Sequence, residues 1–145
     1  MEEKYTYLFI DISNTIISHK VAIKAQEKSF YCISPHRYTP NGTVFGGWAG
    51  HSKSNPTQDD IKAYLKDGDA WPIAATRELL ALWLKQEYHL RPYAEHYFTT
   101  KAPCLRFKAK VLDWDKRKIL TLPGSFESEE LALDAALLEA LERIP

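Results

Sequence analysis

The longest stretch of apolar residues at helical spacing covers residues 70–90. Its apolar positions recur three and four residues apart, which aligns them along one face of an α-helix; they are Ile73, Leu79, Leu80, Trp83, Leu84 and Tyr88. Pro72 is compatible with a first helical turn, and the pattern ends before Pro92, which disfavours helix in the residue preceding it. The sequence therefore predicts a helix over residues 70–90 that is covered on more than one side, with Trp71 and Trp83 in the core.

An earlier segment, residues 15–28, also has helical periodicity. Its apolar positions are Ile16, Ile17, Val21 and Ala25, with lysines on the opposite side. Ser13 or Asn14 is a suitable N-cap, because a short polar side chain accepts a hydrogen bond from the first helical turn. The alternative is one longer helix that also includes Phe9 and Ile10.

The chain ends in a third helical pattern. Ser128 is typical of an N-cap, and Glu129 and Glu130 suit the positive end of the helix dipole. The apolar stripe that follows comprises Leu133, Ala136, Leu137, Ala140, Leu141 and Ile144. A shorter helix is predicted over residues 57–66, with Thr57 as its cap.

The clearest strand covers residues 104–112, where apolar and basic side chains alternate. Residues 113–116 supply a turn, and residues 118–122 return as the antiparallel partner. Residues 93–98 are aromatic but mixed, and their pattern assigns them no element.

The first part of the chain predicts further strands. Residues 5–12 are rich in aromatic and β-branched side chains, and residues 30–34 favour a short buried strand. The pair Asn41-Gly42 is typical of a tight turn, because both residues tolerate positive φ. We therefore expect a hairpin over residues 31–48.

Together these elements predict an α+β fold, with about three main helices packed on antiparallel β-hairpins. The two hairpins could join in one sheet, with the central and last helices covering one face. The length of 145 residues suits a single domain spanning residues 1–145, with a loop-rich insertion at residues 35–69.

Charge and composition narrow the functional classes. The 19 basic and 19 acidic side chains give zero net charge, which disfavours a protein devoted to gripping nucleic acid, although a local patch remains possible. There is no apolar run long enough for a membrane-spanning helix and no basic leader, so we expect a cytoplasmic location. Cys32 and Cys104 fit neither a zinc site nor a redox C-x-x-C motif, and are expected to be buried free thiols.

No catalytic constellation is recognisable, so we expect no enzymatic activity and no cofactor. No two histidines have the i, i+4 spacing of a helical zinc site; His89 and His96 could converge around Pro92, but a metal would require at least one further ligand. The glycines at 46, 47 and 50 do not form a phosphate-binding loop, because that motif requires a lysine after its last glycine and His51 follows Gly50.

If the protein were a hydrolase, its catalytic residues would all have to lie in one loop. Ser52 or Ser54, His51 and Asp59 contain the residue types of a catalytic triad, but no G-x-S-x-G motif supports them. Such combinations arise by chance in a loop of this composition.

Charge is unevenly distributed toward the C-terminus. Residues 101–118 hold seven basic and two acidic residues, a net charge of +5, whereas residues 127–145 hold six acidic and one basic, a net charge of −5. The candidate basic face comprises Arg106, Lys108, Lys110, Lys116 and Arg117. It suits an acidic partner or a nucleic-acid backbone; the alternative is a solvated strand face beside a solvated helix face.

A second candidate surface lies in residues 36–53, which contain cations and aromatics but no acidic residue. The candidate partner-binding residues are Arg37, Tyr38, Phe45, Trp48, His51 and Lys53. Interleaved aromatics and cations can stack on bases or anchor a protein interface. The alternative is that Phe45 and Trp48 complete the hydrophobic core.

Two motifs in the second half of the chain suggest a resemblance. The helical Trp83-Leu84-Lys85-Gln86, a basic hairpin and a closing helix with Ser128-Glu129-Glu130 at its cap resemble small uncharacterised proteins of gut-bacterial phages and mobile elements. Those proteins carry a W-[FL]-[RK]-[EQ] helix, a hairpin and a T-x-E-E-A-x-x-A-A-L helix. The resemblance covers about two thirds of the chain and leaves residues 35–69 without a counterpart. It implies an α+β fold and a mobile-element origin, and it carries no activity.

Two functional hypotheses follow. The first is a small soluble interaction protein of phage or mobile-element origin that binds a protein partner through residues 36–53. The alternative is a nucleic-acid-binding module that uses the basic hairpin and the aromatic loop. Neither hypothesis involves a membrane, and the oligomeric state stays open.

Overall fold

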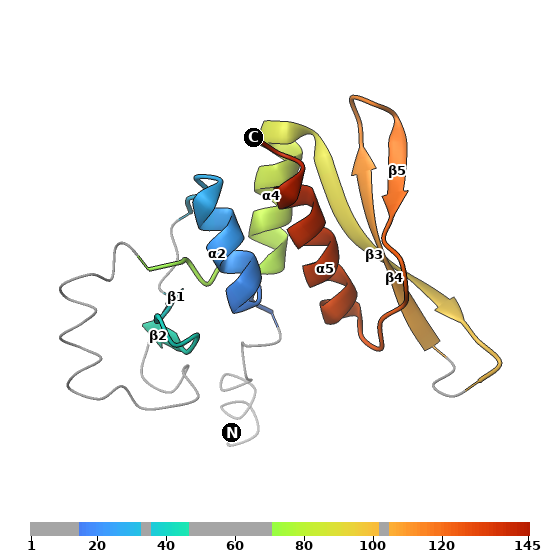
Figure 1. The fold of residues 1–145 in the computed structure, drawn as a ribbon, viewed down its shortest axis with the longest axis horizontal. Coiled ribbons are helices and arrows are strands. Elements are labelled where there is room, and N and C mark those ends of the chain that lie inside the picture. Colours follow the sequence, from blue (N-terminus) through green and yellow to red (C-terminus); the bar gives the residue numbers. More distant parts are fainter. Residues whose placement is uncertain (1–14, 33–35, 47–70, 102–104) are drawn as a thin grey trace, which may run out of the picture.

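A computed structural model describes residues 15–32, 36–46, 71–101 and 105–145 of the chain. Three helices lie side by side in one layer, and a three-stranded antiparallel sheet lies next to α5 (Figure 1). The helices are α2 (His19–Glu27), α4 (Arg77–Tyr88) and α5 (Glu129–Glu142). The sheet has the order β3-β4-β5, formed by Leu90–Phe98, Leu105–Asp113 and Lys118–Thr121. The predicted α+β class is confirmed.

Helix α4 begins later than the predicted start at residue 70. Thr76 is its N-cap, and the Thr76 Oγ1 accepts a hydrogen bond from the Leu79 N–H at 3.2 Å. The residues before Thr76 are extended because their backbone groups bond to distant segments: Ala74 N–H donates to His36 O at 3.1 Å, and Tyr38 N–H donates to Pro72 O at 2.8 Å. The prediction of a helical first turn at Pro72 is therefore wrong, and nonlocal hydrogen bonds are the reason.

Helix α2 also starts later than predicted. Its N-cap is Ser18, whose Oγ accepts from Val21 N–H at 3.3 Å, rather than Ser13 or Asn14. Ile16 and Ile17 are buried but lie outside the helix, because the Ile17 N–H donates to Ala75 O at 2.9 Å. The same extended segment therefore fixes the starts of both α2 and α4.

The first hairpin forms around the predicted turn. Strands β1 (His36–Tyr38) and β2 (Val44–Gly46) are antiparallel, with Arg37 opposite Phe45. Gly42 has φ +84°, a conformation that favours glycine, and a Cβ there would lie 2.9 Å from the His19 Nδ1, so a larger residue would also displace the His19 ring. The prediction of a strand at residues 30–34 is wrong for residues 30–32, which form no strand, and residues 33–34 lie outside the described part. The first strand of the hairpin, β1, begins at His36.

The three-stranded sheet contains one strand that the pattern did not assign. The predicted strand at 104–112 and its partner at 118–122 are confirmed as β4 and β5. Strand β3 pairs with β4 along its whole length, from Leu90 opposite Asp113 to Phe98 opposite Leu105. The two hairpins do not join, since β1 and β2 form a separate sheet.

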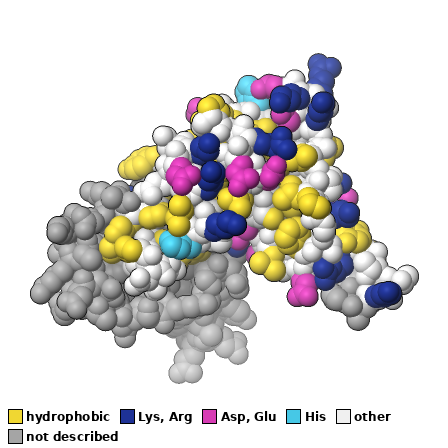
Figure 2. All heavy atoms as spheres, in the orientation of Figure 1, with side chains coloured by type: hydrophobic (Ala, Val, Ile, Leu, Met, Phe, Trp, Pro, Cys, Tyr) yellow, Lys and Arg dark blue, Asp and Glu magenta, His cyan; other side chains and the backbone are white. Residues whose placement is uncertain are grey.

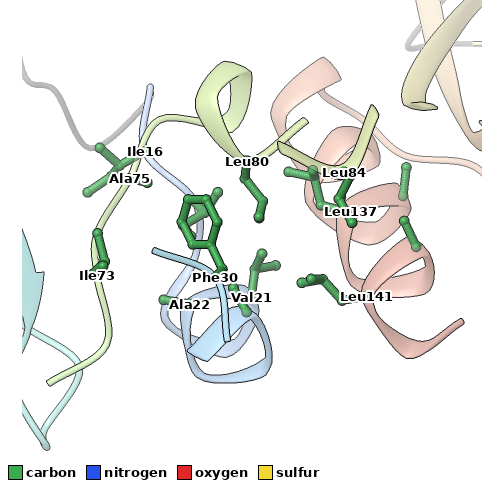
Figure 3. Close-up of a cluster of buried hydrophobic side chains, with 14 of the residues drawn as sticks. Ile16, Val21, Ala22, Phe30, Ile73, Ala75, Leu80, Leu84, Leu137 and Leu141 are labelled. Carbon is green, nitrogen blue, oxygen red and sulfur yellow. The ribbon is translucent and has the colours of Figure 1, made fainter. Parts of the chain in front are cut away.

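The core lies between the three helices and the sheet. Figure 3 shows Leu137 and Leu141 of α5 directed toward Val21 and Leu84 of the neighbouring helices, with Phe30 in the same cluster. Helix α5 also packs against β3 and β4, and three of its fully buried residues are small and one turn apart: Ala132, Ala136 and Ala140. Alanines at this spacing allow the helix to approach the strands closely.

One ion pair is built into the helical layer. The Arg77 guanidinium binds Asp134 through Nε–Oδ1 at 3.0 Å and Nη2–Oδ2 at 3.1 Å, joining α4 to α5. Both side chains are largely buried. The paired geometry satisfies the fork of the guanidinium and fixes the two helices relative to each other.

Several expected elements lie outside the described residues. They are the strand at residues 5–12, the helix at residues 57–66 and the loop containing His51, Ser52, Ser54 and Asp59. These stay predictions.

Candidate nucleic-acid interface

The three-stranded sheet has two chemically different faces, because successive side chains in a strand point to opposite sides. Leu90, Ala109 and Val111 are buried on the face under α5. The other face, called here the outer face, has no buried side chain among the described residues. By register and alternation it comprises Arg91, Tyr93, Glu95, Tyr97, Arg106, Lys108, Lys110, Leu112, Ile119 and Thr121.

Charge on the outer face is predominantly basic. The strand residues of this face include one carboxylate, Glu95, and four cations: Arg91, Arg106, Lys108 and Lys110. A second carboxylate, Glu127, lies beside one of these cations, Arg106, in the segment that leads into α5. Across the β3–β4 ladder the register places Tyr97 opposite Arg106, Glu95 opposite Lys108 and Tyr93 opposite Lys110. Each tyrosine therefore has a cation as its direct cross-strand neighbour.

Contacts on the outer face orient two of these cations. The Lys110 Nζ lies 3.0 Å from the Glu95 Oε2, and the Lys108 Nζ lies over the Tyr97 ring, 5.8 Å from its centroid. The second distance is within the range of a cation–π interaction. Glu95 is the cross-strand neighbour of Lys108, but its carboxylate pairs with Lys110, whereas the Lys108 ammonium lies over the Tyr97 ring.

Arg106 has a more structural position. Its Nη2 donates to the Ser125 Oγ at 2.8 Å, its Nε donates to the same oxygen at 3.1 Å, and its Nη1 lies 3.9 Å from the Glu127 Oε1. These contacts tie β4 to the segment that leads into α5. Arg106 therefore contributes charge to one edge of the outer face while it also holds that segment in place.

The β4–β5 turn adds exposed cations at one end of the sheet. Lys116, Arg117 and Lys118, called here the basic turn, are all exposed, and Arg117 adopts a positive φ of 52°. Figure 2 shows Lys and Arg side chains gathered at this end of the molecule. Asp113 supports the turn, since its Oδ1 accepts from Lys116 N–H at 3.1 Å. The basic surface thus continues from the strands into the turn, where the exposed Asp115 interrupts it.

The aromatic loop residues have a different environment. Tyr38 is 7% exposed and its hydroxyl donates to Ile17 O at 2.6 Å, so it is a core residue and not the exposed contact that we expected. Arg37 Nη1 donates to Trp71 O at 2.9 Å. The side chain of Phe45 lies outside the described part, as do three further candidate residues: Trp48, His51 and Lys53.

Burial has a chemical consequence for Tyr38. Removal from water raises the pKa of its hydroxyl above the ordinary value of 10.0, the Asp134 carboxylate raises it further, and Arg77 lowers it in part. Burial also raises the pKa of the half-buried Cys32 thiol, with Arg37 acting in the opposite direction. Neither group is thereby activated, because both shifts favour the neutral form.

Sequence reasoning did not assign the β3 residues of the outer face. A signal was present, because the polar and aromatic residues at positions 91, 93, 95 and 97 alternate with Leu90, Pro92 and Ala94. Pro92 obscured it, since proline within a run argues against a central strand. In the sheet β3 is an edge strand, where proline is tolerated.

The two histidines flanking Pro92 do not converge. The His89 Nδ1 lies 3.0 Å from the Asp115 Oδ1, whereas His96 pairs with Phe107 near the other end of β3. Seven residues of extended chain separate them, roughly 20 Å. Within the described ranges, no group of three potential metal ligands occurs.

The described residues also line a cavity. It has a volume of about 360 Å³ and lies at the C-terminal end of α5, where its lining includes Asp113, Asp115, Lys116 and Arg143. Two carboxylates balance two cations, so the cavity favours no ligand charge. None of the helices in the described part of the chain has the length and hydropathy needed to cross a bilayer.

Comparison with protein-family models, with curated proteins and with solved structures gives no match to this chain. The resemblance to phage and mobile-element proteins stays a prediction. Functional inference accordingly rests on the residues themselves.

Proposed function

We propose that this protein binds nucleic acid through the outer face of its three-stranded sheet. The observation that carries the proposal is the arrangement on this face, where the strands contribute four cations, two tyrosines and one carboxylate, and where no described side chain is buried. Cations supply attraction for phosphates, and aromatic rings supply surfaces for bases. This proposal takes up the nucleic-acid-binding hypothesis that the sequence suggested as the alternative. The tyrosines of β3 now supply the aromatic rings that were expected from residues 36–53.

The geometry of β4 suits a linear polyanion. Arg106, Lys108 and Lys110 occupy alternate positions of one strand, so their Cα atoms are spaced by about 6.8 Å. A row of cations at regular intervals can follow a backbone of regularly spaced phosphates. Arg91 and the basic turn extend this row toward the opposite end of the sheet.

Zero net charge is compatible with this proposal because the charges are separated in space. The outer face and the basic turn bring together seven of the 19 basic side chains, whereas the first turn of α5 presents Glu129 and Glu130. Local potential, more than total charge, governs the approach of a polyanion. The acidic first turn of α5 would repel a polyanion that approaches the molecule from that side.

The experiment is fluorescence anisotropy with labelled oligonucleotides at about 50 mM and about 200 mM salt, because phosphate contacts make affinity fall steeply over that range. The test variant is Arg91→Glu combined with Lys108→Glu. The matched control is Lys20→Glu combined with Lys85→Glu, which makes the same change in net charge at exposed positions of α2 and α4. We expect the outer-face variant to lose at least about tenfold in affinity and the control to stay within about twofold.

Three outcomes would overturn the proposal: no binding at low salt, binding that ignores salt, or equal losses in both variants. A protein captured from lysate that resists nuclease and high salt would instead favour the protein-partner hypothesis. That hypothesis depends largely on Trp48 and its neighbours, which lie outside the described residues.

A further inference from the structure

The tyrosines of the outer face narrow the kind of nucleic acid that would fit. Tyr93 and Tyr97 lie four residues apart on β3, so they point to the same side and their Cα atoms are about 13 Å apart. Each faces a cation across the ladder, Lys110 for Tyr93 and Arg106 for Tyr97. The face therefore repeats one aromatic–cation unit twice along the strand.

We infer that the ligand is single-stranded nucleic acid, with bases stacked on Tyr97 and Tyr93 and the backbone phosphates held by the β4 cations. This inference rests on the proposed function. In a duplex the flat faces of the bases are covered by neighbouring bases, so tyrosines on a sheet surface have only edges and backbone to contact. In a single strand the base faces are free, and stacking on aromatic side chains is a general mode of recognition.

The contact between Lys108 and Tyr97 supports this assignment. The Lys108 Nζ lies 5.8 Å from the centre of the Tyr97 ring. A base that stacks on Tyr97 takes the place of this ammonium group over the ring, and the displaced Lys108 then lies within reach of the phosphate of the same nucleotide. Stacking uses the π-face that all bases share, so little sequence preference is expected.

Glu95 gives the inference its most specific test. Its carboxylate lies between the two aromatic–cation units and binds Lys110 at 3.0 Å. It therefore repels phosphate and neutralises one of the cations that would hold it. Glu95→Gln removes the negative charge and releases Lys110, so affinity for a single strand should rise, by about threefold or more at low salt. Glu87→Gln, at an exposed position of α4, is the matched control and should change affinity by less than about 1.5-fold.

The tyrosines are tested by substitution that keeps or removes the ring. Tyr97→Leu and Tyr93→Leu should each weaken single-strand binding by about fivefold to a hundredfold, the range produced by loss of one stacked base. Tyr97→Phe and Tyr93→Phe retain the ring and should retain affinity within about twofold. Thermal unfolding of each variant establishes that the sheet is intact, and the phenylalanine variants keep the test informative if a leucine variant does not fold.

The decisive comparison uses one oligonucleotide sequence as a single strand and as a duplex. Single-strand affinity should exceed duplex affinity by at least about tenfold. Equal or tighter duplex binding, or leucine variants that bind like the parent protein, would overturn this inference and leave the proposed function standing. Failure to bind either form would overturn both.

Discussion

Two ion pairs of nearly equal length lie in contrasting regions of this molecule. Arg77 and Asp134 meet at 3.0 Å in the helical layer, where their side chains are 10% and 16% exposed. Lys110 and Glu95 also meet at 3.0 Å, on the outer face of the sheet, where their side chains are 18% and 51% exposed. The first pair has two parallel hydrogen bonds, and the second has one.

The difference shows that the distance between two charges does not by itself determine how much an ion pair contributes to the free energy of unfolding. A buried charge that loses its partner is left without water to solvate it, whereas an exposed charge is solvated and screened. We therefore expect the helical layer to carry stability and the outer face to carry binding. Substitutions should separate the two properties.

The largest effect is expected in the helical layer. Arg77→Ala leaves the Asp134 carboxylate largely buried and unpaired, so the free energy of unfolding should fall by about 3 kcal/mol. Urea denaturation measures this change. The double variant Arg77→Met with Asp134→Leu removes both charges and should recover most of the loss. A single-variant loss below about 1 kcal/mol would contradict the contrast between the two pairs.

An intermediate effect is expected at Tyr38, which shares this environment. Tyr38→Phe deletes the hydrogen bond to Ile17 O and should cost about 1 kcal/mol at neutral pH. Because the folded-state pKa of Tyr38 is raised, the fold favours the neutral hydroxyl. Its contribution is full below the unfolded pKa of about 10 and is lost as pH rises above that value.

Unfolding of the parent protein and of Tyr38→Phe across alkaline pH tests the direction of this pKa shift. Stability of the parent protein should fall more steeply above about pH 10 than stability of Tyr38→Phe. Tyr31→Phe is the control, since Tyr31 is 70% exposed and should leave both the stability and its pH dependence unchanged. Parallel alkaline curves for the parent and Tyr38→Phe would rule out the assigned shift.

The smallest effect on stability is expected on the outer face. Lys110→Gln breaks an ion pair in which Glu95 stays solvated, so the free energy of unfolding should change by less than about 0.5 kcal/mol. Urea denaturation beside Arg77→Ala gives the comparison directly. A loss above about 1.5 kcal/mol would show that the two regions do not divide stability and binding as we propose.

The sequence predicted elements whose determinants are local. Ser128 and the two glutamates after it marked the start of α5, the alternating basic residues marked β4, and Asn41-Gly42 marked the first turn. In each case the side chains that decide the conformation lie within a few residues of it. These elements formed where the pattern placed them.

The prediction was wrong where distant backbone groups compete with local preference. Residues 72–75 have a helical pattern, yet Tyr38 and His36 draw them into an extended conformation. No spacing within the segment reveals those partners. The candidate site was recovered in part for the same reason: the β4 cations were predicted, whereas the β3 tyrosines acquired a role only when the register placed them opposite those cations.

The hydrogen bond from Tyr38 N–H to Pro72 O has a consequence for the order in which the fold assembles. It joins β1 to the extended segment before α4, two segments that are far apart in the sequence. Bringing such distant segments together costs closure entropy before any contact forms, and this cost grows with their separation. We therefore expect the β3–β4 pairing, whose strands are close in sequence, to form before the contact between β1 and Pro72.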